Sequence, residues 1–286
     1  MSRTLWVLTL FIELLSPCIV IADEPDPKVM KSWVEYYKEI ARSYEIGLRS
    51  APNTFLTVVE TPVLVYSNPT SGRDTHGAIF IWTRNGRAEV IGDIWSRLTG
   101  TTPTTARMVK HSFHSLAIEP LNAKGMDGVV WAPDEPGIVL KPIPEAPAPA
   151  QTATGRLTQM RVISKRFNGF DIPAPTSANV EERERMLRLL PTPIYRYVND
   201  DRLQESADGA VFAFLFDWDP EIILVIEIRP TKEGARWHYG LARMDNKSLR
   251  VEYNGETVWE NTERNLGSQR AKYYSVTATT RPNEFK

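Results

Sequence analysis

The sequence predicts an α+β protein made mainly of antiparallel β meanders, arranged in two related repeats that each carry a covering helix and pack into a shared core. Three observations lead to this expectation. The chain resembles itself at a fixed offset, Asn-Gly turns separate apolar strand-like segments, and an amphipathic helical pattern precedes the first of them. With 42% hydrophobic and 24% charged residues, the 286-residue chain has an ordinary globular composition.

The charge and cysteine content exclude several classes of function. The 34 Lys and Arg residues nearly balance the 35 Asp and Glu residues, which argues against a chain-wide surface for nucleic acid. A single cysteine rules out a disulfide framework and any cysteine-built metal or iron–sulfur site. We therefore expect no cofactor, no metal site and no nucleic-acid partner.

Residues 1–22 have the pattern of a secretory signal peptide. Arg3 supplies the positive start, residues 5–15 form the apolar region, and Ala22 ends a small-residue cleavage site. We expect a secreted or periplasmic protein with no integral membrane span after cleavage, since no later apolar run approaches the length needed to cross a bilayer.

The only cysteine, Cys18, lies inside this leader and raises the alternative of a lipoprotein. Pro17 stands where a lipoprotein signal wants a small residue, and apolar residues continue after Cys18. Simple cleavage is therefore the favoured interpretation, and the mature chain would contain no cysteine.

The internal similarity divides the chain. Residues 56–68 match 187–199 with 5 identities in 13, and residues 77–94 match 209–226 with 6 identities in 18. Such self-similarity is typical of a duplicated structural unit.

The repeats bound the predicted domains. The first α+β repeat covers residues 23–132 and the second covers 156–260, followed by a C-terminal strand or tail at 261–286. Between the repeats, residues 133–155 form a proline-rich linker, because proline fixes φ and removes a main-chain donor.

Two helices are expected from local signals. In the first, Asp26 is a capping residue, Pro27 suits the first turn and Gly47 closes the C-terminus. In the second, Asn179 begins a capping box and the helix runs to Leu190 before a proline. The stretch 157–163 allows either a helix or a strand.

Most other segments have the pattern of strands. They form hairpins at Asn85-Gly86 and Asn254-Gly255, and a hairpin with a four-residue turn at 217–220. The expected strands are 77–83, 87–95, 109–117, 211–216, 221–228, 235–243, 249–253 and 256–259. Several inner strands are apolar on both faces, so we expect them to be covered on both sides, by helices or by the other repeat's sheet.

The loop 71–77 is the strongest catalytic candidate in the sequence. It places the carboxylate of Asp74 and the imidazole of His76 beside a strand start, where functional loops often lie. The second repeat has no histidine there. A solvated turn is the simpler alternative, because no partner nucleophile is evident.

Two further residues are weak acid–base candidates. Asp93 stands where the second repeat has Val225, on a strand expected to be buried. His114 follows His111 at a spacing that places the two rings on opposite faces of a strand, which argues against metal binding. We aligned His114 with His238 as a position shared by both repeats.

Matching positions in the two repeats favour structural roles. Glu89 and Glu221 occupy such positions, as do Trp131 and Trp259, which we expect in the core. Trp218, at a turn between two aspartates, is the tryptophan expected to be exposed and is a weak candidate for ligand binding.

The segments Asp208–Glu221 and Trp237–Met244 resemble a family of uncharacterised secreted proteins from planctomycete bacteria, as does Arg156–Arg161 after the linker. The resemblance implies bacterial export. The family carries no known activity, so no site residue is transferred from it.

Together these observations favour an exported, non-catalytic binding or envelope-associated structural protein of unknown ligand, with an envelope protein or a glycan as its partner. One alternative is a secreted hydrolase-like enzyme that uses the 71–77 loop with Asp93 or His114. A weaker alternative is a carbohydrate-binding module. Motifs of common hydrolases and nucleotide binders are absent.

Overall fold

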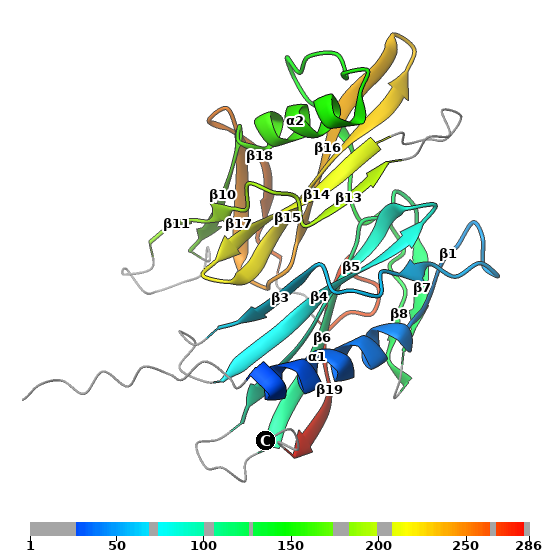
Figure 1. Cartoon of the computed structure of the whole chain (residues 1–286), viewed down its shortest axis with the longest axis vertical. Coiled ribbons are helices and arrows are strands. Elements are labelled where there is room, and N and C mark those ends of the chain that lie inside the picture. Colours follow the sequence, from blue (N-terminus) through cyan, green and yellow to red (C-terminus); the bar gives the residue numbers. More distant parts are fainter. Residues whose placement is uncertain are drawn as a thin grey trace, which may run out of the picture.

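The computed structural model describes residues 27–68, 74–99, 106–125, 128–173, 183–198, 208–263 and 267–282. In these residues the protein consists mostly of antiparallel β-sheets with two helices, which confirms the predicted α+β class (Figure 1). Neither helix is long and apolar enough to cross a membrane. The predicted signal peptide lies outside the described residues.

The first helix, α1 (Pro27–Arg42), buries Trp33 and Tyr37 against a sheet. It ends earlier than predicted, because Gly47 belongs to strand β1 (Glu45–Leu48) rather than to a helix C-terminus. The second helix, α2 (Ala153–Ser164), resolves the ambiguous stretch 157–163 as helix and begins within the segment predicted as linker.

The prediction of a helix at 179–190 is wrong for residues 183–190, which are the part of it that the structure describes. Residues 183–190 instead form the short strands β11 (Arg185–Met186) and β12 (Arg188–Leu189). Between them the main-chain N–H of Leu187 donates to Gly169 O, and the Leu187 side chain is buried. Long-range pairing and burial therefore outweigh the local capping pattern.

Two large sheets form the centre of the molecule. The first has the order β19-β6-β5-β4-β2, with β3 also paired to β4, and the second has the order β12-β14-β15-β16-β9, with β13 also paired to β14. The strands of the first are β2 (Thr57–Val58), β3 (Leu64–Ser67), β4 (Thr75–Arg84), β5 (Arg87–Leu98), β6 (Ala106–Ser115) and β19 (Tyr273–Pro282). Those of the second, besides β12, are β9 (Lys141–Pro142), β13 (Tyr195–Val198), β14 (Asp208–Phe216), β15 (Asp219–Thr231) and β16 (Gly234–Arg243).

Two smaller sheets flank the large ones, with the orders β1-β7-β8 and β11-β10-β17-β18. Their remaining strands are β7 (Leu121–Lys124), β8 (Val130–Trp131), β10 (Phe167–Ile172), β17 (Ser248–Tyr253) and β18 (Glu256–Asn261).

Both predicted Asn-Gly hairpins are confirmed. Asn85 and Gly86 have φ values of 52° and 81°, and Asn254 and Gly255 have values of 51° and 87°. This left-handed backbone is the one that a two-residue hairpin turn requires.

The third hairpin turn is shorter than predicted. Phe216 pairs with Asp219, so the turn has two residues, Asp217 and Trp218, rather than four. Asp217 takes a positive φ of 52°, a conformation that aspartate tolerates better than most residues.

The inner strands are covered on both faces, as predicted. On β4, Phe80 and Trp82 pack toward α1, whereas Ile79 and Ile81 pack against the second large sheet. On β14 the same alternation directs one face toward α2 and the other toward the first large sheet. The layers are therefore helix, sheet, sheet and helix, with the sheets between α1 and α2 in Figure 1.

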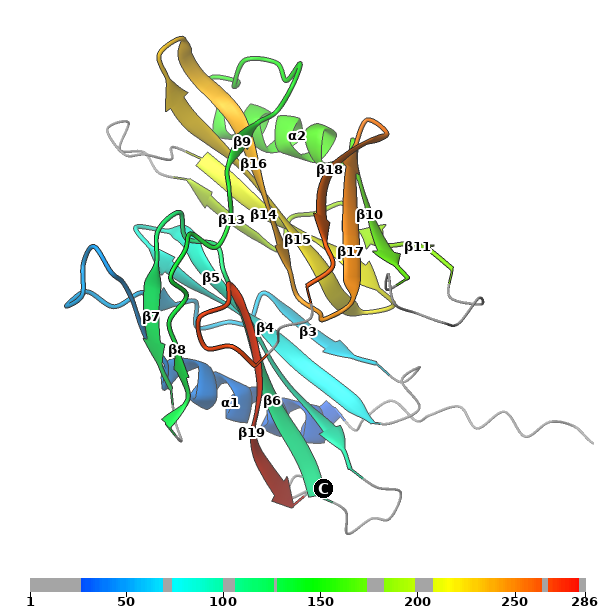
Figure 2. The ribbon, with the colours of Figure 1, turned by 180° about the vertical axis from the view of Figure 1, so that it is seen from behind.

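Two segments cross between the halves of the molecule. The proline-rich stretch buries Ile138 and Ile143 in the core and pairs with β16 only at β9, on the sheet edge, where proline is tolerated. The C-terminal strand β19 returns to the first large sheet and pairs with β6 (Figure 2).

Candidate functional site

Asp74 and His76 belong to a closed hydrogen-bond network at the edge of the first large sheet. Arg107 Nη1 donates to Asp74 Oδ2 at 2.6 Å, His76 Nδ1 lies 2.9 Å from Tyr37 Oη, and Tyr37 Oη lies 2.6 Å from Ser96 Oγ. Burial, aided by the charge of Arg107, lowers the pKa of His76 to about 3, so the ring is neutral at pH 7. Residues 71–73 of the loop lie outside the described residues.

Asp93 and His114 lie elsewhere, at the interface between the two large sheets. Tyr66 Oη donates to Asp93 Oδ2 at 2.8 Å. His114 Nδ1 lies 3.0 Å from Arg243 O, and its Nε2 lies 3.4 Å from Gly137 O. Within the described ranges, the structure joins neither residue to Asp74 or His76 by a hydrogen bond.

His111 and His114 point to opposite faces of β6, as predicted. His111 Nδ1 lies 2.6 Å from Tyr44 Oη on the α1 side, whereas His114 faces the second large sheet. Burial lowers the pKa of each to about 4. No group of three or more His, Cys, Asp or Glu side chains suited to a metal ion occurs in the part of the chain that the structure describes.

Trp218 is exposed, as predicted, at the tip of the β14–β15 turn. Its relative exposure is 58%, and the guanidinium of Arg188 lies 5.3 Å from the ring centroid. The ring therefore already has one cation–π contact from the same chain.

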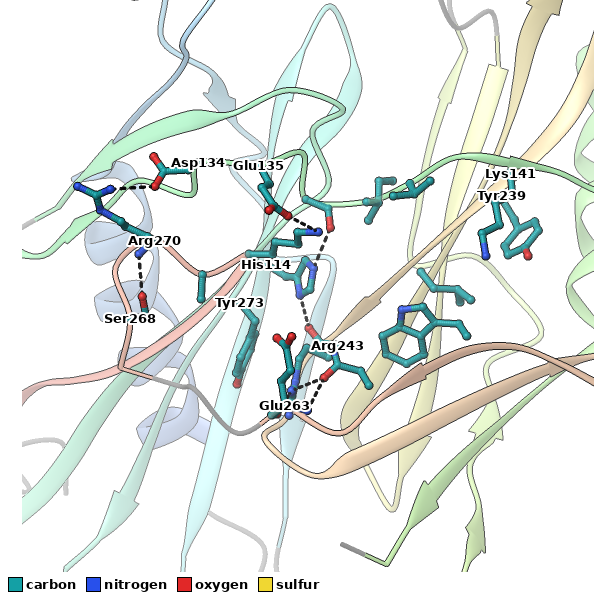
Figure 3. A pocket seen from close by; sticks show the side chains of 18 of the residues that line it. His114, Asp134, Glu135, Lys141, Tyr239, Arg243, Glu263, Ser268, Arg270 and Tyr273 are labelled. Carbon is teal, nitrogen blue, oxygen red and sulfur yellow. Dashed lines mark hydrogen bonds and ion pairs between the residues drawn. The ribbon is translucent and has the colours of Figure 1, made fainter. Parts of the chain in front are cut away.

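A groove that the sequence did not reveal opens where the two halves meet. It encloses about 630 Å³ between the edge of β16, strand β18, the proline-rich segment and the residues before β19 (Figure 3). Its lining includes Tyr239, Leu241 and Arg243 from β16, Val258, Trp259 and Asn261 from β18, Gly137, Ile138, Val139 and Lys141 from the proline-rich segment, and Ser268, Arg270, Ala271, Lys272 and Tyr273. Four distant stretches contribute, so no local motif marks the groove.

The groove has an aromatic wall and a charged rim. Tyr239 and Trp259 form the wall, and Trp259 is half-buried rather than in the core as predicted. On the rim, Lys272 Nζ lies 3.0 Å from Glu135 Oε2 and Arg270 Nη1 lies 3.2 Å from Asp134 Oδ2.

Arg243 closes the floor of the groove by binding main-chain oxygens. Its guanidinium donates to Asp245 O at 2.5 Å, to Lys247 O at 3.0 Å, to Glu263 O, and to Asn261 Oδ1 at 2.8 Å. These bonds join the end of β16 to the chain after β18, which makes the floor rigid.

Two buried ionic clusters lie near the sheet interface, outside the groove. In the arginine cluster (Arg87, Glu89, Tyr197, Glu227 and Arg229), Arg87 lies 2.9 Å from Glu227 and 2.8 Å from Glu89. Tyr197 Oη donates to Glu227, and Arg229 lies 3.4 Å from it. Burial nevertheless raises the pKa of Glu89 to about 7.

The aspartate cluster (Tyr66, Asp93, Asp219, Glu221, Asp245 and Lys247) is rich in carboxyls. Lys247 Nζ lies 2.5 Å from Glu221 and 3.1 Å from Asp245. Burial raises the pKa of Asp219 to about 7. It also raises those of Asp93 and Glu221, and neighbouring carboxylates add to each effect. Among the residues that the structure describes, Asp93 Oδ1 and Glu221 Oε2 find no hydrogen-bond partner.

Comparisons with protein-family models, with curated proteins and with solved structures each return no match to this chain.

Proposed function

We propose that the protein is an exported, non-catalytic binding protein of the cell envelope and that the groove between β16 and β18 is its binding surface. The observation that carries the proposal is the half-buried Trp259 beside Tyr239 in a cavity of about 630 Å³. Binding sites are typically concavities of this size that combine aromatic walls with a few polar groups. The partner is an envelope protein or a glycan.

The polar groups around the groove support binding rather than catalysis. His114 and Arg243 use their nitrogens to bind main-chain oxygens. The enzyme alternative would need the network of Asp74 and His76, where the serine that the described residues supply, Ser96, is fully buried against Tyr37 and Arg107. A nucleophile must reach its substrate, and Ser96 does not meet that condition.

We also propose that the two halves of the molecule are repeats of one structural unit. The order β2 and β3, β4, β5, β6 in one sheet corresponds to β12 and β13, β14, β15, β16 in the other, and each series follows a helix. The small sheets β1-β7-β8 and β10-β17-β18 correspond in the same way. These shared strand orders support two related repeats.

The strand register changes one alignment made from the sequence. His114 pairs with Ile91, and Ile223, which lies 132 residues after Ile91, pairs with Ala242. The counterpart of His114 is therefore Ala242 rather than His238, and the histidine is specific to the first unit.

A capture experiment tests the proposed function. Immobilised protein lacking residues 1–22 is exposed to solubilised envelope from the producing cells, next to the double variant Trp259→Ala/Tyr239→Ala and the control Trp218→Ala. We expect a specific component to bind the wild type and the control and at least tenfold less of it to bind the double variant. Equal capture by all three proteins, or no capture, contradicts the groove as the binding surface.

The enzyme alternative is tested on the same preparations. Turnover of ester, peptide or glycoside substrates that is lost in His76→Ala would replace the binding proposal with the hydrolase-like one. We expect no such turnover.

A further inference from the structure

The outer edges of the two large sheets are covered to different extents. Along β6, strand β19 pairs from Ala106 to His114. Along β16, the short strand β9 pairs only with His238 and Tyr239. The end of β16 that lines the groove therefore lies beyond the covering strand.

Trp131 and Trp259, which occupy corresponding positions in the two units, differ in how far the neighbouring chain covers them. Trp131 on β8 is 1% exposed, stacks on Phe113 at 5.7 Å and donates its indole N–H to Ala271 O at 2.8 Å. Trp259 on β18 lines the groove, and its indole N–H makes no hydrogen bond within the described residues. The segment that leads into β19 thus covers the first tryptophan, and within the described residues no equivalent segment covers the second.

The main chain of β16 presents hydrogen-bonding groups to the same groove. Trp237 O accepts from Ile143 N and Arg243 O lies beside His114, so alternate residues from 237 to 243 direct their main-chain groups outward. Among these, Leu241 lines the groove, and the described part of the chain supplies no partner for its outward N–H and C=O. Tyr239 pairs with Lys141 on one side of Leu241, and Arg243 O contacts His114 on the other, so the open part of this edge is centred on Leu241.

We propose that the groove binds an extended polypeptide segment of a partner protein as an added strand beside β16, with a main-chain carbonyl of that segment accepting from Trp259 Nε1. This inference rests on the proposed function and specifies its ligand. The groups awaiting a partner within the described residues are the main-chain N–H and C=O of Leu241 and the indole N–H of Trp259, and an extended peptide matches the paired main-chain groups of a strand residue whereas a sugar does not. The corresponding place in the first unit is filled by polypeptide, at residues 271–276.

A peptide selection tests the inference. A display library of random nonapeptides is selected on the protein without residues 1–22, and the affinity of the enriched peptides is measured by fluorescence anisotropy. We expect binding to weaken at least tenfold in Trp259→Ala and to be unchanged in the control Trp218→Ala. Trp259→Phe keeps an aromatic ring without the N–H, so we expect an intermediate loss while the fold, checked by circular dichroism, is retained.

The role of the peptide main chain is tested separately. N-methylation of every second peptide bond removes main-chain donors without changing the side chains. The bonds can be methylated in two alternating sets, or registers, and methylation of the set that faces β16 should abolish binding. Failure to enrich any peptide, equal affinity for Trp259→Ala, or insensitivity to N-methylation in both registers would each overturn the inference.

A glycan array with the same proteins separates this inference from the proposed function. Trp259-dependent binding of a glycan, without peptide binding, overturns the peptide strand and keeps the groove as a binding surface. Absence of both overturns both.

Discussion

The arginine cluster and the aspartate cluster differ in how their buried carboxyls are compensated. Both contain a glutamate from the start of the second meander strand, Glu89 or Glu221. In the arginine cluster, Arg87 lies within 2.9 Å of two glutamates. In the aspartate cluster, Lys247 forms ion pairs with both Glu221 and Asp245, and its charge also acts on Asp219.

This difference shows that buried carboxyls in one fold can be stabilised in two ways. A buried carboxylate requires a cation and hydrogen bonds, as at Glu227. Where cations are too few, burial raises the carboxyl pKa, and the group takes up a proton instead, as at Asp219 with a pKa of about 7. The two clusters should therefore respond differently to substitution and to pH.

The largest effect is expected from Arg87→Met. The change removes the cation that pairs with both Glu89 and Glu227 and leaves Glu227 with the longer contact to Arg229, and breaking a buried pair in this way costs about 3–5 kcal/mol. The free energy of unfolding in urea at pH 7 measures it. Arg229→Met, which removes one 3.4 Å contact, is the matched control and should cost much less. A loss below about 1 kcal/mol for Arg87→Met would show that the cluster does not depend on its arginine.

Asp93→Asn should stabilise the protein. Burial and the charge of Asp219 raise the pKa of Asp93, so its cost to the folded state is absent below the unfolded-state pKa of about 4, grows as the pH rises from there, and levels off above the folded-state pKa. Asparagine keeps an acceptor for Tyr66 without the charge. We expect a gain of about 1–3 kcal/mol at pH 8 and a smaller one at pH 5, from urea unfolding.

The exposed Asp134 provides the control for this prediction. Its ion pairs with Arg49 and Arg270 lower its pKa, so Asp134→Asn should give no gain at pH 8. A gain from Asp93→Asn that is the same at both pH values would contradict the assigned cause.

Removal of one tyrosine hydroxyl from each cluster compares the clusters directly. Tyr197 donates to Glu227, which is ion-paired with Arg87, whereas Tyr66 donates to a carboxyl with a raised pKa. Hydrogen bonds to charged groups contribute about 1.5–3 kcal/mol and those to neutral groups about 0.5–1.5 kcal/mol. Tyr197→Phe should therefore cost more than Tyr66→Phe in urea unfolding at pH 6, and the reverse order would refute the comparison.

The smallest effect is expected from Lys247→Met, at about 1 kcal/mol, because the side chain is about one-third exposed and the carboxyls around it can take up protons. The loss should be greater at pH 8 than at pH 5, since burial already favours the protonated form of Glu221. Thermal unfolding at the two pH values measures the difference. A cost as large as that of Arg87→Met would mean that the two clusters are compensated alike.

Sequence reasoning succeeded where the deciding interactions are local or periodic. Asn85-Gly86 predicts its hairpin because both residues tolerate the left-handed backbone of the turn. The continuous apolar run of β4 predicts a strand covered on both faces, since successive side chains point to opposite sides. The face of α1 follows from the spacing of Trp33 and Tyr37.

It failed where a local signal competes with a distant one. Asn179 and Glu182 have the pattern of a capping box, yet the chain near Leu187 pairs with β10 and β14. The candidate site shows the same limit. Asp74 and His76 were found as a motif, but their closure by Tyr37 and Arg107 depends on how the helix packs on the sheet.

By itself, the sequence determined the α+β class, the main strands, the hairpin turns and an internal similarity at an offset of about 132 residues, because these follow from side-chain periodicity and backbone preference. Only the tertiary structure decided that β19 pairs along the outer edge of β6, how the buried carboxyls share their cations, and that Trp259 borders an open groove. Those features depend on contacts between segments that are distant in the sequence, such as β6 with β19 and Arg87 with Glu227, and a local pattern carries no information about such contacts.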